Sequence, residues 1–290
     1  MIPRNLTLRI FATATLLLAL NGCVNLDDAA GLSKLSDEAR VALPKVSNDI
    51  AGTCARQNTL FDDTPSKERP QDSKPLDCKP YNDLSAQLAQ DQNILLDYFD
   101  ALGKIASDQA TYGEAIDANV TTIGASSKLS ASAATASIEA QSILKAITDA
   151  ATRGYREKQL GQLVKDNDSA IQSLTKALKK IITGDYGVML SNEESTLDNF
   201  YQGPMAAAQA SAQPTERLAL ILVQRQYSGD KTALQSRKDA VANYGKVMDG
   251  LAELHAKLAQ QATQKASPAQ IAKEIAPIVK LLKITLANLQ

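Results

Sequence analysis

Tryptophan is absent from this 290-residue sequence, aromatic residues make up only 4% of it, and His255 is its one histidine. A single histidine excludes metal sites built from several histidines or from histidine and cysteine together. A Ser–His–Asp triad would have to use His255, and no nucleophile-elbow motif accompanies it. Because His255 lies beside an apolar helical stripe through Leu251 and Leu258, we expect it to be a structural residue.

The motifs of common cofactor sites are also missing. The sequence contains neither a Gly-x-x-x-x-Gly-Lys phosphate loop nor a Gly-x-Gly-x-x-Gly nucleotide motif. Residues 166–168 (Asp-Asn-Asp) are similar to the start of a calcium loop, but the required glycine and distal glutamate are missing, which favours a solvated helix face. The sequence therefore predicts no catalytic residue, no metal site and no cofactor. Paired carboxylates of the glycosidase type stay open, since only geometry selects them.

An excess of basic residues is lacking as well. The chain carries 31 Lys and Arg against 32 Asp and Glu. Residues 1–22 contain two of the arginines and no acidic residue, so the chain after them has 29 basic and 32 acidic side chains, a net charge of −3. Without a basic field, neither nucleic acid nor an anionic lipid surface is implied as a partner.

The N-terminus has the organisation of a secretory signal. Arg4 and Arg9 precede an apolar run over residues 10–20, and the run leads into Leu20-Asn21-Gly22-Cys23. A basic start, a short apolar middle and a small residue at the end are typical of such a signal. The run is too short to span a bilayer comfortably.

These last four residues resemble the lipobox of bacterial lipoproteins, with leucine three places before the cysteine and a small residue directly before it. Asn21 is a less usual occupant of its place. The resemblance implies that residues 1–22 are removed and that Cys23 carries lipid at the new N-terminus. The alternative is an ordinary cleaved signal peptide followed by an unrelated cysteine. The stretch from Tyr98 to Ala106 also resembles helical lipoproteins of unassigned function, which implies no activity.

The lipoprotein resemblance implies membrane lipid as a partner, through the acyl chains on Cys23. Three chains would anchor the protein essentially permanently, since each buried methylene contributes about 0.8 kcal/mol. Many such lipoproteins carry aspartate directly after the cysteine to stay in the inner membrane, whereas Val24 stands here. We therefore expect the protein in the cell envelope, at the outer membrane facing the periplasm if the host has two membranes.

Strand patterns with period-two alternation are hard to find, whereas Ala, Leu, Gln, Lys, Ser and Asp dominate. This composition suits helices packed closely through small side chains. Apolar residues recur at alternating spacings of four and three, which indicates helices with one buried face. The clearest stripes are Leu84, Leu88, Leu95, Tyr98, Leu102 and Ile105, interrupted by Asp91, and Leu160, Val164, Ile171, Leu174, Leu178 and Ile181. The sequence predicts an all-α fold, an elongated bundle of long antiparallel helices.

Breaks and caps divide this pattern into expected helices over about 33–54, 81–107, 112–151, 160–181, 191–201, 214–229, 241–262 and 267–290. Small residues in 112–151 leave a low-complexity linker as the alternative there. Pro44 should kink or divide the first helix. Gly184 provides a helix end, and Ser191 with Glu194 a capping box that opens the next helix. Residues 218–223 are apolar nearly all round, so we expect them to be the most buried segment.

Residues 57–80 are expected to form a loop, because four prolines and many charges fill them. Cys54 and Cys78 flank this loop, and an even pair of cysteines in an oxidising compartment indicates a disulfide. A disulfide that closes the chain between Cys54 and Cys78 would stabilise the fold by about 3–4 kcal/mol. Two free thiols are the alternative for the cysteines, and a binding loop instead of a stapled surface loop is the alternative for the segment.

The predicted organisation is a signal peptide over 1–22, a lipidated tether over 23–32, and one helical bundle domain over 33–290 that includes the loop. With no catalytic constellation, the expected function is a non-enzymatic binding or scaffolding module with an envelope protein as partner. A membrane-active protein, pore-forming or remodelling, is an alternative that would use Leu218–Val223. An envelope enzyme is the third possibility.

Overall fold

The computed structural model describes residues 30–64, 74–106, 131–152, 157–210 and 213–261, together with positions 280, 281, 284 and 287. Within these ranges the regular structure is entirely helical, which confirms the all-α prediction. The predicted signal peptide, the lipidation residue Cys23 and the helix start at Ser267 lie outside the described residues.

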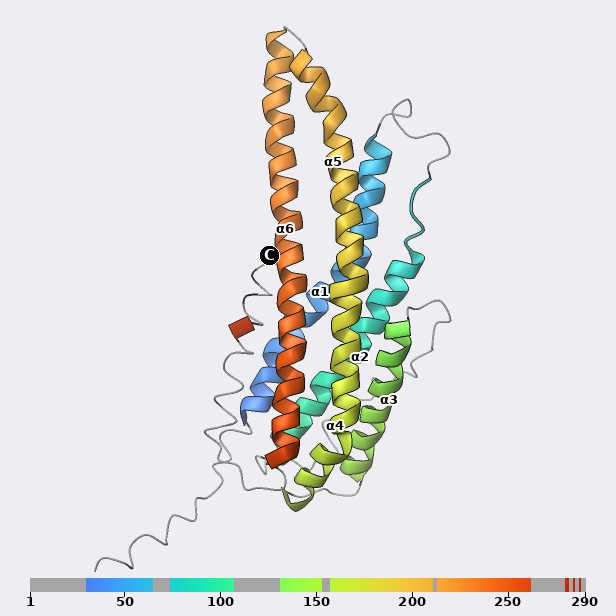
Figure 1. Cartoon of the computed structure of the whole chain (residues 1–290), viewed down its shortest axis with the longest axis vertical. Coiled ribbons are helices and arrows are strands. Elements are labelled where there is room, and N and C mark those ends of the chain that lie inside the picture. Colours follow the sequence, from blue (N-terminus) through green and yellow to red (C-terminus); the bar gives the residue numbers. More distant parts are fainter. Residues whose placement is uncertain are drawn as a thin grey trace, which may run out of the picture.

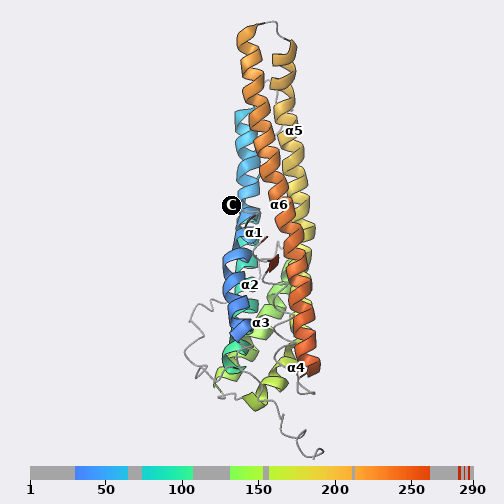
Figure 2. The same ribbon diagram turned by 90° about the vertical axis from the view of Figure 1, so that its left-hand side faces the viewer.

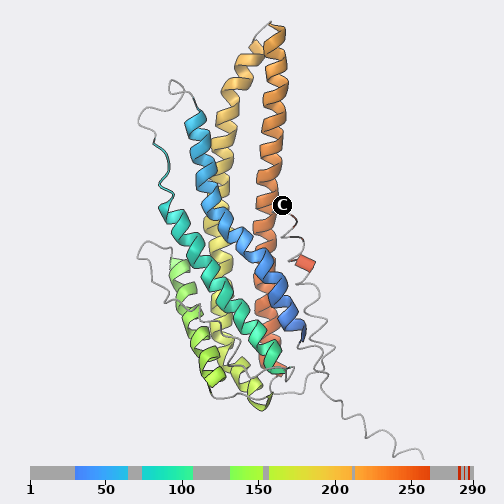
Figure 3. The same ribbon diagram turned by 180° about the vertical axis from the view of Figure 1, so that it is seen from behind.

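The molecule is an elongated bundle of helices (Figure 1), which is narrower when it is viewed after a quarter turn about its long axis (Figure 2). The elements are α1 (Ala30–Asp63), α2 (Lys79–Ala106), α3 (Ala131–Thr152), α4 (Glu157–Lys180), the π-helix η3 (Ile181–Tyr186), α5 (Gly187–Ala210) and α6 (Pro214–Gln261). Helices α1 and α2 run antiparallel, and so do α3 and α4, and α5 and α6 (Figures 1 and 3).

The core lies along the predicted stripes. Of the stripe on α2, Leu84, Leu88, Leu95, Tyr98 and Leu102 are buried, and on α4 and η3 so are Ile171, Leu174, Leu178 and Ile181. Small side chains of α3 supply the remaining contacts, because Ala133, Ala136 and Ala140 are fully or nearly fully buried. Over residues 131–152 the expected helix is therefore present, and its backbone packs closely against its neighbours.

Helix α1 is longer at both ends than the sequence pattern indicated. It begins at Ala30, so the last three residues of the predicted tether 23–32 are helical, and Leu32 is already buried in the core. It passes through Pro44 without ending there. Packing on α2 compensates for the interior proline, which costs a helix about 3 kcal/mol or more.

The predicted loop over 57–80 was too long, because residues 57–63 form the last two turns of α1. Gln57 is buried and Leu60 packs against the core, whereas the first proline of the segment comes only at Pro65. The cysteine pairing is confirmed: Cys54 and Cys78 form a disulfide across a Cα–Cα distance of 5.6 Å. Asn58 adds two hydrogen bonds to the backbone of Leu76, of 2.7 and 3.0 Å.

The predicted helix end at Gly184 was wrong, and α4, η3 and α5 form one uninterrupted helical rod. The chain passes through Gly184 as part of a π-helix, and Ile181, Ile182 and Tyr186 are all buried in that segment. This burial outweighs the poorer hydrogen-bond geometry of the wider turn. The predicted capping box was also wrong, since the Ser191 hydroxyl lies inside α5 and donates to the carbonyl of Gly187 at 3.1 Å.

Helix α6 begins at Pro214 as predicted, but it runs without a break to Gln261. The expected end at residues 229–231 does not occur, because Asp230 and Lys231 accept and donate hydrogen bonds across to α5. With 48 residues at about 1.5 Å each, α6 is about 72 Å long and extends along the whole molecule.

Candidate functional site

His255 is the one histidine of the sequence and belongs to α6, where its side chain is fully buried. Its Nδ1 lies 2.9 Å from Asp168 Oδ1, and its Nε2 lies 2.8 Å from the hydroxyl of Tyr98. With Nδ1–H donating to the carboxylate, Nε2 accepts from the tyrosine. Burial lowers the pKa of His255, against the opposing effect of Asp168. The Asp–His–Tyr chain thus joins α4, α6 and α2 inside the core, which agrees with a structural role.

The sequence predicted a solvated helix face for residues 166–168. Asp168 instead directs its carboxylate to the buried His255, so this face is only partly solvated. Asn167 is buried and donates to the carbonyl of Leu163 at 2.8 Å. No group of three or more His, Cys, Asp or Glu side chains that could hold a metal ion occurs in the part of the chain that the structure describes.

A compact ion cluster joins α1, α5 and α6. Arg56 binds Asp49 through Nη1 at 2.8 Å and Glu193 through Nε at 2.7 Å. Arg237 approaches the same Glu193 carboxylate at 2.6 Å, and the Tyr186 hydroxyl donates to Asp49. The two arginines balance the two carboxylates, and each carboxylate has several donors around it. The sequence pattern indicated only a capping box at the adjacent Ser191 and Glu194 and gave no sign of this cluster.

Beside this ion cluster lies a cavity of about 210 Å³, which Leu60, Leu197 and Ala233 line together with both arginines, Glu193 and Asp230. Burial would lower the pKa of Arg56, but its hydrogen bonds to Glu193 and Asp49 outweigh that effect and raise it. The arginine charges are therefore committed to the carboxylates of the cluster, and the arrangement holds three helices together.

A second group of polar and aromatic side chains links α5 to α6 further toward the C-terminus of α5. We call this group the clasp; it consists of Asp198, Tyr201, Tyr227 and Asp230. The hydroxyl of Tyr201 on α5 donates to Asp230 on α6 at 2.7 Å, and the hydroxyl of Tyr227 on α6 donates to Asp198 on α5 at 2.9 Å. The two rings lie 5.3 Å apart. Lys231 adds ion pairs to Asp198 and to a neighbouring glutamate of α5. This reciprocal pattern holds the two helices in one register.

Beyond the clasp, α5 and α6 continue as a two-helix hairpin that projects past the end of α1 (Figures 1–3). We call residues 202–210 and 214–226 the hairpin tip. None of these residues is buried. Leu218, Ile221 and Leu222 are 60%, 48% and 58% exposed, although they are among the most apolar side chains of α6. The prediction that 218–223 is the most buried segment was wrong, because no other described element packs around this end of the bundle.

The hairpin tip is also poor in charge. Between Gln202 and Gln226 only Glu216, Arg217 and Arg225 are charged. Leu218, Ile221 and Leu222 follow the spacing of one helical face, so they form a continuous apolar stripe. Contiguous exposed apolar surface is typical of protein–protein or membrane interaction sites. Scattered exposed residues such as Val188 need no such explanation.

None of the described helices is both long enough and apolar enough to cross a membrane. No family model matches this chain, and neither a curated protein nor a solved structure matches it.

Proposed function

We propose that this protein is a lipid-anchored helical module of the cell envelope that binds another envelope protein without catalysing a reaction. The single observation that carries the proposal is the exposed apolar stripe on the hairpin tip. A surface of Leu218, Ile221 and Leu222 provides hydrophobic contact area for a partner, and it contains no group suited to acid, base or nucleophilic chemistry.

The start of α1 and the hairpin tip lie toward opposite ends of the described bundle. The N-terminal end of α1 (Ala30–Asp63) points away from the hairpin tip (Figures 1 and 3). Cys23 precedes Ala30 by only seven residues. A lipid on Cys23 would hold the membrane end of the rod, and α6 would carry the tip about 70 Å along the bundle axis. This arrangement suits a module that presents a contact surface at a distance from its membrane.

Photocrosslinking in intact cells tests the proposed contact. The full chain would carry a photoreactive residue in place of Leu222 at the tip or, as control, in place of Ile138, which is 67% exposed on α3. We expect a discrete crosslinked species from position 222 and none, or at least tenfold less, from position 138. Equal crosslinking from both positions, or none from position 222, would contradict the proposal.

A membrane-active protein is the second candidate, and the same exposed stripe favours it. Residues 218–223 extend over only about 9 Å of helix, against the roughly 30 Å of a bilayer core. They could enter one leaflet at most. Dye release from liposomes by the mature protein separates the two functions: release that disappears in Leu218→Gln/Leu222→Gln would favour membrane activity, and intact liposomes would favour a protein partner.

A further inference from the structure

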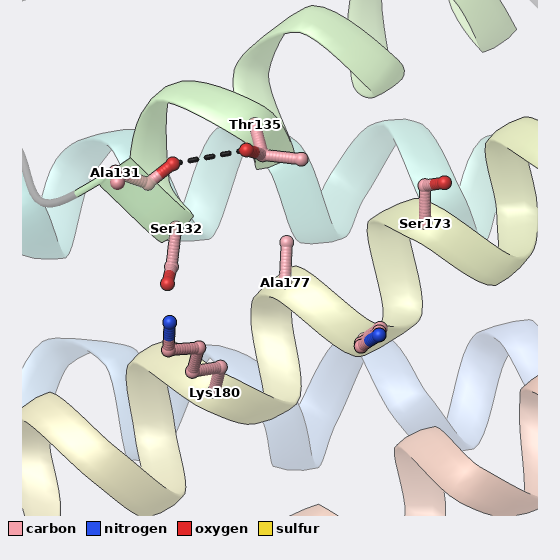
Figure 4. Close-up of a pocket in the computed structure, with 7 residues that line it drawn as sticks. Ala131, Ser132, Thr135, Ser173, Ala177 and Lys180 are labelled. Atoms are coloured by element: carbon pink, nitrogen blue, oxygen red, sulfur yellow. Dashed lines mark hydrogen bonds between the residues drawn. The ribbon is translucent and has the colours of Figure 1, made fainter.

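A second surface feature is independent of the hairpin tip. A cavity of about 330 Å³ opens between the first turns of α3 and the last two turns of α4 (Figure 4). Its polar lining consists of three hydroxyls, on Ser132, Thr135 and Ser173, and two ammonium groups, on Lys176 and Lys180. Ala131 and Ala177 leave the space between the two helices open. The volume is at the small end of the range for ligand pockets.

The two lysines are exposed side chains that bring positive charge to the cavity. Lys176 and Lys180 are one helical turn apart on α4, so they share a face and repel each other. Neither makes an ion pair within the described part of the chain, whereas the adjacent Lys179 pairs with Asp249 at 2.7 Å. An anion between the two ammonium groups would relieve this repulsion.

Ser132 provides the second observation that indicates a ligand. Its side chain belongs to a residue that is only 7% exposed, yet its hydroxyl has no hydrogen-bond partner among the described residues. Figure 4 shows this hydroxyl directed into the cavity, toward the ammonium of Lys180. Thr135 donates its proton to the carbonyl of Ala131 at 2.9 Å, which leaves its oxygen free to accept. The Ser132 hydroxyl oxygen is open to the cavity, so a ligand there with both donors and acceptors can hydrogen-bond to it.

We infer that this cavity binds a small polyol phosphate, with the phosphate between the two lysines and the polyol hydroxyls on Ser132, Thr135 and Ser173. The phosphate matches the double positive charge, and the polyol hydroxyls match the donors and acceptors that line the cavity. The ligand chemistry has two sources, a soluble polyol phosphate or the headgroup of phosphatidylglycerol. The site lies away from the hairpin tip, so it does not depend on the proposed partner contact.

Binding to the chain from residue 23 onward, with Cys23→Ser so that no acyl chain contributes to vesicle binding, tests the inference. The probes are glycerol 3-phosphate, inorganic phosphate, and vesicles of phosphatidylcholine with and without phosphatidylglycerol. We expect Lys176→Gln/Lys180→Gln to lose at least tenfold in affinity for glycerol 3-phosphate or for the phosphatidylglycerol vesicles. The matched control is Lys145→Gln/Lys165→Gln, which removes the same charge from exposed positions of α3 and α4 and should bind as the wild type does. Ser132→Ala should lose severalfold without a change in charge.

The outcomes separate the two ligand sources. Lysine-dependent binding of glycerol 3-phosphate in solution identifies a soluble ligand, and lysine-dependent binding of vesicles alone identifies the lipid headgroup. Either result supports the site. Equal affinity in the two double variants, or no binding of either probe, would overturn it. Inorganic phosphate that binds as tightly as glycerol 3-phosphate would overturn the role of the hydroxyls.

Discussion

Asp91→Asn should be more stable than the wild type at pH 8, by up to about 4 kcal/mol in the free energy of unfolding. Asp91 is fully buried on α2 and has no cationic partner among the described residues. From the residues that the structure describes, it receives two hydrogen bonds, from the amide of Gln87 at 3.0 Å and from the hydroxyl of Ser137 at 3.5 Å. Burial raises its pKa from 3.8 to about 7, against the weaker opposing effect of these two bonds.

The pH dependence of this effect has a definite sign. A carboxyl group whose folded-state pKa is raised contributes most stability when it is protonated, below about pH 4, and loses that contribution as the pH rises toward 7. The difference between Asp91→Asn and the wild type should therefore be small at pH 4, grow through pH 7, and stay constant above it. Asparagine keeps the size of aspartate and can still accept from Gln87 and donate to Ser137.

Urea denaturation at pH 4, 6 and 8 measures this difference directly. Asp97→Asn is the matched control, because Asp97 lies on the same helix, is exposed and pairs with Arg40. Its stability should change by less than about 1 kcal/mol at every pH. An Asp91→Asn variant that is less stable than the wild type at pH 8 would show that the charged carboxylate has a function in holding the core together.

Glu193→Ala should destabilise the fold by up to about 3–5 kcal/mol, because it leaves the charge of Arg237, whose side chain is 15% exposed, without its nearest carboxylate. The Glu193 side chain is only 5% exposed and accepts from Arg56, Arg237 and the hydroxyl of Thr53. Removal of its carboxylate would leave two arginines with only Asp49 as a counter-charge. The loss should appear as a lower urea midpoint with an unchanged slope.

The neighbouring residue provides the control. Glu194 also pairs with two cations, Lys231 and Lys238, but these groups are about a third exposed. Hydrogen bonds from Lys231 and Lys238 lower the pKa of Glu194 to about 2, so it stays charged at every pH of interest. Glu194→Ala should cost about 1 kcal/mol or less, since solvent screens exposed pairs. Equal losses for Glu193→Ala and Glu194→Ala would contradict the view that burial gives the first cluster its importance.

Much of the fold could be predicted because each helix repeats its apolar stripe over many turns. Leu84 through Leu102 and Ile171 through Ile181 lie in the core as their spacing indicates. The interruption at Asp91 was also a usable signal, because a polar residue at a stripe position must be buried with the rest. The disulfide could be predicted from the even number of cysteines that follow Cys23 and from the expected oxidising compartment.

The wrong predictions of helix boundaries share a physical cause, because packing between distant segments overrides the local sequence signals. Gly184, Ser191 and Asp230 are residue types that often stand at a helix boundary. Contacts with α1 or with the facing helix nevertheless keep the chain helical at these positions. The hairpin tip shows the opposite failure. An apolar run predicts burial only where another element covers it, and a single sequence does not indicate that α5 and α6 extend beyond their neighbours.

The most direct test of the account is the attachment of fatty acid to Cys23, because the lipid defines which end of the rod is held at a membrane. Cells that produce the full chain would be labelled with a palmitate analogue, and the wild type compared with Cys23→Ser. We predict that the wild type carries the label and partitions with membranes, whereas Cys23→Ser carries none. An unlabelled wild type would contradict the lipid anchor and, with it, the proposed arrangement of anchor and tip.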